Sequence, residues 1–277
     1  MPQLETDAFV ASDWLECGRI FEQNHLPLSV RREIKQLLTV PASIRSTIPL
    51  QTLSVTQLLD ANFVATLDHN LNSNSITLST CIPHTHIPDN FLMWTVPPLH
   101  LATQLLDQFG QAWFDGHASV IHPYSPTVHL PFWVLSYWRD VSHVLEARLT
   151  WLKSHDWILA RLNHNEHDHH AAELVLIDEA LDILEYLPWD ADLKGFGACV
   201  GIRTSALPPL LANAMIDGRI VDALIAAING HLDEHSGSSC VVENLDLASI
   251  FLLDNDGLRI GCTLTFGLIE ALYMFFY

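Results

Sequence analysis

Basic side chains are scarce in this sequence. Of 277 residues only 13 are lysine or arginine, against 32 aspartates and glutamates, so the formal charge is −19 at pH 7. A phosphate backbone or an anionic membrane needs a cationic face on the protein that binds it. The composition therefore argues against nucleic acid as a partner, although an acidic protein can bind a basic patch on another protein. The basic residues are also uneven: Arg31, Arg32, Lys35 and Arg45 lie close together, and none follows until Arg139.

Charged residues of both signs together make up only 16% of the chain, whereas hydrophobic residues make up 49%. This composition supplies ample material for a core and excludes wholesale disorder. The length suits one large domain or two small ones.

Paired cysteines and a secretory signal are missing as well. The cysteines are odd in number and show no CxxC spacing: Cys17, Cys81, Cys199, Cys240 and Cys262. The N-terminal stretch is acidic and lacks the apolar run of a signal peptide. We therefore predict an intracellular protein, cytoplasmic or nuclear, with free thiols.

One apolar segment, Gly257–Tyr277, is about long enough to span a bilayer. Arg259 and Glu270 fall within it, and burying Glu270 in lipid would be costly. We therefore predict no clear membrane span. A buried strand–helix pair, a poor tail anchor and translation of a wrong reading frame or an unspliced intron are the alternatives.

Short motifs of the common enzyme classes are absent from the sequence. It contains no GxSxG, no P-loop, no GxGxxG, no kinase motif set and no HExxH. The DNDG at 254–257 resembles part of a calcium loop, but Leu252 would stand where the first carboxylate ligand is required. We therefore predict no cofactor.

Histidine, by contrast, is abundant, and its densest run is NHNEHDHH at Asn163–His170. His164, His167 and His170 are spaced by three, so on a helix they could share a face, as zinc ligands do. However, the run is poor helix material and has no cysteine nearby. We favour a solvated hairpin loop over a metal or pH-sensitive site.

The remaining histidines are predicted to be surface or internally hydrogen-bonded residues. A Cys81–His84–His86 cluster lacks a fourth metal ligand in the sequence. We expect His117, His122 and His129 to be spread over a loop, and predict no metal site.

Helical periodicity recurs along the chain, in the ranges 29–38, 97–116, 131–162, 169–187 and 216–232. The stretch 46–96 is rich in Ser, Thr, Asn and Pro, which predicts loops with one or two short strands. In the longest helix, one apolar stripe is predicted to face the core: Val134, Trp138, Val141, Leu145, Leu149 and Leu152. The aromatic residues of that helix are expected in the core too: Trp133, Tyr137, Trp138, Trp151 and Trp157.

The predicted fold is therefore mainly α. A long antiparallel helical hairpin forms its centre, with a loop-rich N-terminal half and a truncated α+β C-terminal fragment. The predicted regions are 1–96, loop-rich; 97–190, helical with the hairpin; and 205–277, a partial peptidase-like fragment with the apolar tail.

Two segments resemble a known family. LPFWVLSYWRDVSHVLEARLTWLKSHDWI, followed by YLPWD, is similar to the helical region upstream of the peptidase domain in fungal ubiquitin-like protein-specific (SUMO-specific) cysteine proteases. ALPPLLANAMIDGRIVDALIAAINGHL resembles the opening of that peptidase domain, where a Trp-Leu-x-Asp-x-x-Ile pattern begins the first helix. The resemblance covers about residues 130–253.

On that pattern, Asp217 takes the acidic position and Ile220 the isoleucine position, while Met215 replaces the leucine and Ala214 the tryptophan. The resemblance implies that Asp217 and Ile220 contact a ubiquitin-like partner, with the acidic residue facing a basic side chain. An N-terminal helix carboxylate favoured by the helix dipole is the alternative interpretation of Asp217. Ala214 would leave part of the family's binding tunnel without its wall.

The family's catalytic elements come after this helix: a His-Trp pair, then an Asp or Asn, then a Cys behind a Gln. None of these follows here, so the chain is predicted to hold no catalytic residue. One hypothesis is the pre-catalytic part of a cysteine-type peptidase that cleaves after Gly-Gly, inactive as this chain. The other is a non-catalytic helical module that binds a ubiquitin-like or another protein.

The natural transcript, sequenced past the codon for Leu253, separates the two hypotheses. The truncated-protease hypothesis expects a nearby frame that encodes the His-Trp pair, the Asp or Asn, and the Cys behind a Gln. A transcript that ends as the printed sequence does would contradict it and leave the interaction module.

Overall fold

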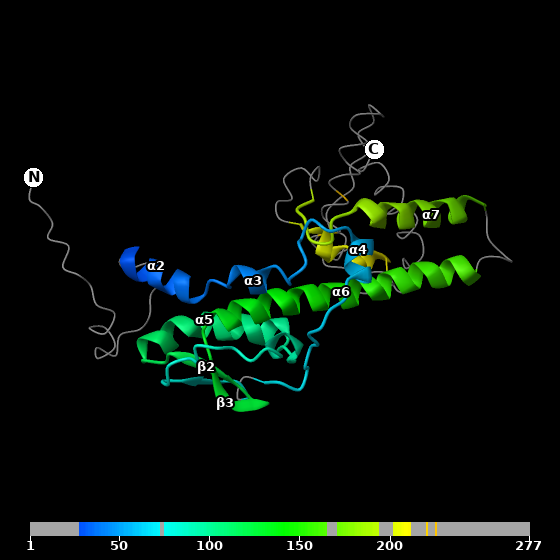
Figure 1. Cartoon of the computed structure of the whole chain (residues 1–277). Helices are drawn as coiled ribbons and strands as arrows, with labels where there is room; N and C mark the ends of the chain where they lie inside the picture. Colours follow the sequence, from blue (N-terminus) through cyan, green and yellow to red (C-terminus); the bar gives the residue numbers. More distant parts are fainter. Residues whose placement is uncertain are drawn as a thin grey trace, which may run out of the picture. The chain divides into compact units, whose positions relative to one another are not determined.

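Helices make up most of the structure, and one small sheet accompanies them (Figure 1). The computed structural model describes residues 28–72, 75–164, 171–193 and 202–211, together with Ile220 and Ile225. The prediction of a mainly helical chain is confirmed in its helix content, but the antiparallel sheet makes the class mixed α and β. No helix within those ranges is long and apolar enough to cross a membrane. The apolar stretch 257–277 lies outside the described residues.

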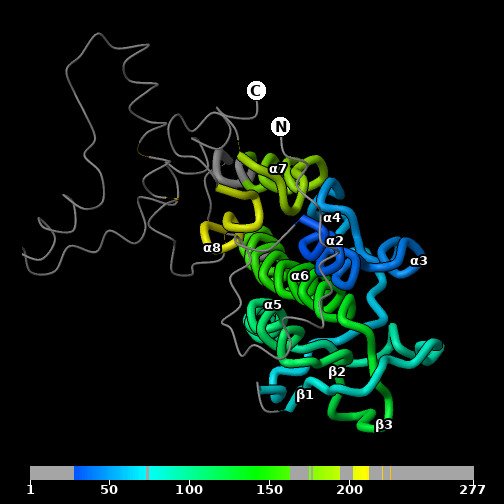
Figure 2. Tube along the Cα trace, turned by 90° about the vertical axis from the view of Figure 1, so that its left-hand side faces the viewer, coloured from blue at the N-terminus to red at the C-terminus, as the bar shows by residue number. Residues whose placement is uncertain are grey.

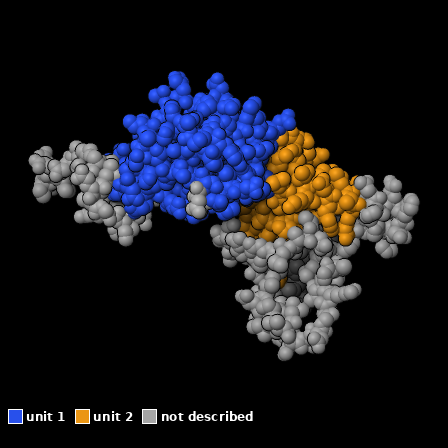
Figure 3. Space-filling model, turned by 90° about the horizontal axis from the view of Figure 1, so that it is seen from below, with its two compact units in different colours: residues 1–49, 62–146 blue, residues 50–61, 147–277 orange. Residues whose placement is uncertain are grey.

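The chain divides into two compact units that are discontinuous in sequence (Figure 3). Unit 1 takes its described residues from the chain up to Pro49 and from Asn62–Glu146, and unit 2 takes them from Leu50–Ala61 and from Ala147 onward. The long helix α6, Trp133–His164, contributes residues to both units. These units therefore cut across the contiguous regions that composition suggested.

Unit 1 contains a three-stranded antiparallel sheet in the order β1-β2-β3 (Figure 2). Its strands are β1 (Thr77–Ser79), β2 (Ser119–His122) and β3 (Ser125–Leu130). A tight hairpin joins β2 to β3, with a register irregularity between Ile121 and His122. The prediction of a loop for His122 and His129 is wrong, because these residues pair within β2 and β3. Cross-strand pairing supplies backbone partners that local sequence does not reveal.

The helix α5, Leu99–Phe114, matches the predicted helix near 97–116. It begins behind two prolines, which need no amide partner there. The Leu99 N–H, which has no acceptor within the helix, donates to the carboxylate of Glu146 at 2.7 Å. Gly116, with φ of 84°, follows the helix end in the left-handed conformation that glycine adopts at low cost.

The helix α2, Leu28–Leu37, agrees with its prediction to within one residue at each end. It buries Val30 and Ile34, which are four residues apart and share one face. A short helix α3, Ala42–Arg45, follows Pro41. The core of unit 1 joins α2, α5, the sheet and the start of α6 in one cluster, which includes Val30, Phe109, Val120, Phe132 and Trp138.

Unit 2 is built around α4 (Val55–Asp60) and α7 (Ala171–Tyr186), which contact each other. The helix α4 was not predicted, although its start carries a recognisable signal. Ser54 and Gln57 form a reciprocal capping box, in which each side chain accepts from the other residue's backbone N–H. Unit 2 also contains the 3-10 turn η3 (Thr204–Ala206) and the short helix α8 (Pro208–Leu211). A second 3-10 turn, η2 (Phe91–Met93), belongs to unit 1.

The predicted apolar stripe of α6 is confirmed only for its first half. Val134, Trp138, Val141 and Leu145 are buried, but Leu149 is 43% exposed and Leu152 is 37% exposed. The buried residues of the second half lie on a neighbouring stripe: Trp151, Ser154 and Ile158. Trp151 on this stripe donates to the Trp189 carbonyl, and Ser154 donates to the Pro208 carbonyl, so tertiary contacts decide which face of the helix is buried.

This shift of the buried stripe gives a stability prediction. Ile158→Ala should lower the free energy of unfolding by about 2–5 kcal/mol, because it leaves a cavity in the core. Leu152→Ala, a matched aliphatic truncation on the same helix, should cost less than about 1 kcal/mol because the side chain is partly in water. Urea titration of both variants measures the difference. Equal losses would contradict the assignment of the buried face.

Candidate functional site

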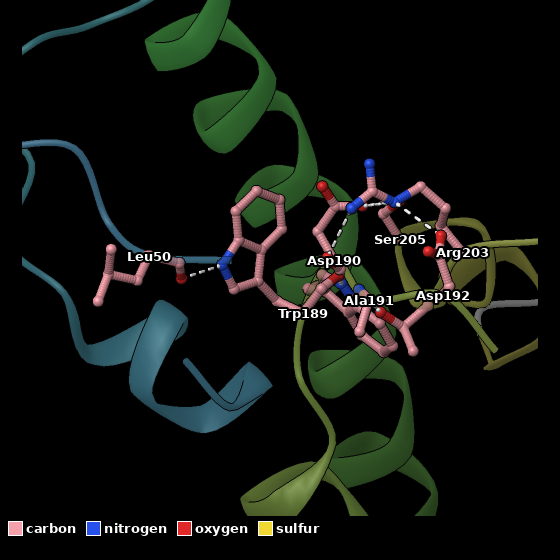
Figure 4. A network of polar contacts seen from close by, with 9 residues as sticks. Leu50, Trp189, Asp190, Ala191, Asp192, Arg203 and Ser205 are labelled. Carbon is pink, nitrogen blue, oxygen red and sulfur yellow. Dashed lines mark hydrogen bonds and ion pairs between the residues drawn. The ribbon is translucent and has the colours of Figure 1, made fainter. Parts of the chain in front are cut away.

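Trp189 of the YLPWD motif lies at the centre of unit 2 (Figure 4). Its indole is buried, and its Nε1–H donates to the carbonyl oxygen of Leu50 at 2.9 Å. Its backbone N–H donates to the Leu53 carbonyl at 3.0 Å, and its own carbonyl accepts from the Trp151 indole at 3.4 Å. The residue therefore joins the segment before α4 to α6 and to the end of α7.

Asp190, the next residue of the motif, is buried and carries a dense set of polar contacts (Figure 4). Its Oδ1 accepts from the Ser205 hydroxyl at 2.9 Å and lies 2.9 Å from Arg203 Nε. Arg203 Nη2 also donates to the Asp190 carbonyl at 2.9 Å, and Arg203 Nε lies 3.8 Å from Asp192 Oδ1. The Oδ1 atom of this carboxylate is therefore held by structural donors.

A short antiparallel pairing holds this network in place. The Leu193 N–H donates to the Ile202 carbonyl at 2.9 Å, and the Thr204 N–H donates to the Ala191 carbonyl at 2.8 Å. The Thr204 hydroxyl accepts from the Ala191 N–H at 2.8 Å. YLPWD is thus a structural motif of unit 2, which accounts for the packing of its Trp and Asp.

In unit 1, His122 is a buried histidine within an aromatic cluster. Its ring lies 5.4 Å from the Trp94 ring, 5.4 Å from the Tyr124 ring and 5.6 Å from the Trp138 ring, between centroids. Its Nε2 lies 3.1 Å from the Thr95 carbonyl, which can only accept, and its Nδ1 accepts from the Tyr124 N–H at 3.3 Å. These two contacts fix the neutral tautomer that carries the proton on Nε2.

The ionisable groups of this cluster are perturbed in a consistent way. Burial lowers the pKa of His122 below its ordinary value, against the opposing effects of the Thr95 carbonyl and of the charge on Asp68. The Tyr124 hydroxyl donates to Asp68 at 2.5 Å, which lowers the pKa of Asp68 and raises that of Tyr124. Both ring nitrogens of His122 are engaged by the backbone, so this histidine stabilises the fold and is not a ligand.

A Ser–His contact occurs at the end of the sheet, but it is not a nucleophile–base pair. Ser119 Oγ lies 3.3 Å from His129 Nδ1, yet the hydroxyl is buried and donates to the Cys81 carbonyl at 2.7 Å. The backbone N–H of His129 donates to His84 Nδ1 at 2.9 Å. A buried hydroxyl whose proton points to a backbone carbonyl is not activated for attack.

The sequence analysis considered a metal cluster of Cys81, His84 and His86. Among the described residues, no group of three or more His, Cys, Asp or Glu side chains is placed to hold a metal ion. His84 instead stacks on His129, with ring centroids 5.6 Å apart. His164 is the last residue of α6, and residues 165–170 of the histidine run lie outside the described part of the chain.

Of the two predicted partner contacts, Asp217 lies outside the described residues. Ile220 is helical, as the resemblance requires, and is only 3% exposed. Such burial favours a core position for the Ile220 side chain. The contact of Asp217 with a partner stays a prediction.

The exposed side of α7 was not singled out from the sequence, although its spacing gives a signal. Asp178, Asp182 and Glu185 follow at i, i+4 and i+7 and are all exposed, while the helix contains no lysine or arginine. Val175, 54% exposed, and Tyr186, 79% exposed, flank these carboxylates. We call these five residues the α7 acidic face.

The three carboxylates of the α7 acidic face have no ion pair or hydrogen bond within the part of the chain that the structure describes. The opposite side of α7 is anchored on α4. The Thr56 hydroxyl donates to the Leu184 carbonyl at 3.2 Å, and the Val55 N–H donates to the Leu187 carbonyl at 2.9 Å. The α7 acidic face is therefore held on a fixed support.

Comparison with known proteins identifies no relative. No family model matches the sequence, and neither the curated proteins nor the solved structures contain a significant match.

The Asp190 network gives a second prediction. Arg203→Ala should lower the free energy of unfolding by about 1–3 kcal/mol, because it leaves the buried Asp190 carboxylate with fewer donors. Arg139→Ala is the matched control, since Arg139 pairs with Asp140 at 2.8 Å on the surface. That change should cost less than about 1 kcal/mol. Chemical denaturation of both variants measures the losses, and equal losses would show that the network contributes no more than a surface pair.

The buried His122 gives a third prediction, on pH. Its folded-state pKa lies below the value of about 6.5 of an unfolded chain. The unfolded state therefore binds a proton first as the pH falls below about 6.5, and stability is lost down to the folded-state pKa. His122→Phe keeps the ring volume and removes this titration.

The free energies of unfolding of the wild type and His122→Phe, followed from pH 8 to pH 5, test this expectation. The variant should be less stable at neutral pH, where it lacks two hydrogen bonds, but its stability should fall less steeply with acidification. Parallel pH profiles would show that His122 is not the group responsible.

Proposed function

We propose that this chain is a non-catalytic protein-interaction module, and that the α7 acidic face binds a basic segment of a partner protein. The observation that carries the proposal is a row of exposed carboxylates, Asp178, Asp182 and Glu185, that have no ion pair or hydrogen bond among the described residues and lie between two exposed apolar side chains. The predicted antiparallel pairing of α6 with α7 belongs to this proposal, as the frame that presents the face.

Elementary electrostatics favours a basic occupant. Like charges four residues apart on a helix destabilise it by about 0.2–0.5 kcal/mol, so Asp178 and Asp182 repel each other in the free chain. A cationic partner segment would relieve that repulsion and would be steered toward the face by the field of the acidic protein. Tyr186 suits an anchor, because tyrosine contributes a large ring and a polar tip at interfaces.

Catalysis by the described residues has no comparable support. The one Ser–His contact, between Ser119 and His129, is buried, and Cys81 is exposed at the end of the sheet. The sequence resemblance favours a specific version of this proposal. In it, the chain descends from a SUMO-specific cysteine peptidase and its partner is a ubiquitin-like protein.

Titration calorimetry with a SUMO-type modifier tests the proposal. The double reversal Asp178→Lys and Asp182→Lys should weaken binding at least tenfold, or about 1.4 kcal/mol, because attraction becomes repulsion. Asp107→Lys is the control, since Asp107 is an exposed carboxylate on α5.

A second probe is an amphipathic peptide with lysines at i, i+4 and i+7. If the peptide binds and the modifier does not, the ubiquitin-like partner is wrong and the interaction module stands. If neither binds, or if the double reversal leaves binding unchanged, the α7 acidic face is not the contact surface.

A further inference from the structure

The chain carries a basic face that matches the α7 acidic face in spacing. On α2, Leu28, Arg32 and Lys35 follow at i, i+4 and i+7, which places them on one side of the helix. Arg32 and Lys35 are exposed, and Leu28 is 69% exposed. We call these three residues the α2 basic face.

Neither Arg32 nor Lys35 has an ion-pair partner within the ranges that the structure describes. The opposite side of α2 buries Val30 and Ile34 in the core of unit 1, so the basic face is held outward. Arg45, also exposed, adds a further positive charge from α3. The α2 basic face is therefore an unsatisfied cationic surface on a folded support.

We infer that the α2 basic face of one copy of the chain docks on the α7 acidic face of a second copy. The charges of the two faces are opposite in sign, and Arg32 and Lys35 on α2 have the same three-residue spacing as Asp182 and Glu185 on α7. Each face also ends in an exposed apolar side chain, Leu28 on one and Tyr186 on the other, which can exclude water from the ion pairs. The inference rests on the proposed role of the α7 acidic face.

A second copy is favoured over an unrelated protein by the distribution of charge. The chain has a formal charge of −19, yet the segment from Arg31 to Arg45 holds four of its 13 basic residues. General repulsion opposes contact between copies of so acidic a protein, and the concentration of positive charge in this segment offsets that repulsion locally. The two faces are different surfaces, which makes the contact heterologous and lets it continue from copy to copy.

Sedimentation velocity on the full chain over a range of concentrations tests the inference. The wild type should form species heavier than the monomer as concentration rises. Arg32→Glu with Lys35→Glu removes the α2 basic face, and Asp178→Lys with Asp182→Lys removes the α7 acidic face. Each double variant alone should remain monomeric, whereas Asp107→Lys, an exposed change on α5, should behave as the wild type.

Mixing the two double variants gives the decisive measurement. The mixture pairs the intact α2 basic face of one variant with the intact α7 acidic face of the other, and the two reversed faces are complementary as well, so it should form dimers or larger species although neither variant associates alone. The quadruple variant, with both faces reversed, should associate as the wild type does.

A wild type that stays monomeric at every concentration would overturn the inference. So would association that survives either double variant, or a mixture that does not dimerise. If the chain is monomeric while the basic peptide still binds the α7 acidic face, the inference fails and the proposed function stands. A change of frictional ratio without a change of mass in the variants would place the contact within one copy and overturn the inference as well.

Discussion

The hydrogen bond from the Trp189 indole to the Leu50 carbonyl joins residues 139 positions apart in the chain. Around it, the Trp189 backbone bonds to Leu53, and the Trp151 indole bonds to Trp189. A buried indole N–H needs a hydrogen-bond acceptor, and the Leu50 carbonyl supplies it for Trp189. The indole ring of Trp189 is itself fully buried in unit 2. The position of α4 beneath α7 depends on this arrangement, and the α7 acidic face depends on α4 for its support.

Polar groups stabilise both units from inside rather than at the surface. In unit 2, Asp190 is buried with Ser205 and Arg203 around it. In unit 1, His122 is kept neutral among aromatic rings, with one nitrogen on the Thr95 carbonyl and the other on the Tyr124 amide. A buried polar group without partners is costly, so each of these side chains has its neighbours specified closely.

Charge in this protein is sparse but segregated. A charged fraction of 16% leaves few ion pairs to spread over the surface. The carboxylates of α7 and the basic residues of α2 lie on separate helices, each with its other side buried. Segregation of this kind contributes little to the stability of the monomer, because surface pairs are weak. Under the proposed function it acts instead on association, through steering and through the choice of partner.

The positions of α2 and α5 could be predicted from local sequence. The periodic apolar residues of α2 and α5, the prolines before α5 and Gly116 after it are local signals, and their physical basis lies within a few residues of chain. The capping box of Ser54 and Gln57 was also available in the sequence, although it was not used. Only the tertiary structure decided that Leu149 and Leu152 are exposed while Trp151 and Ile158 are buried, because the side of a helix that is buried depends on its neighbours. The same holds for His122, because its strand β2 forms only by pairing with β1 and β3. It holds for the α7 acidic face as well, because contact with α4 on the other side of α7 determines which side is exposed. Local spacing specifies an element, whereas contacts between distant segments specify which of its faces meets water.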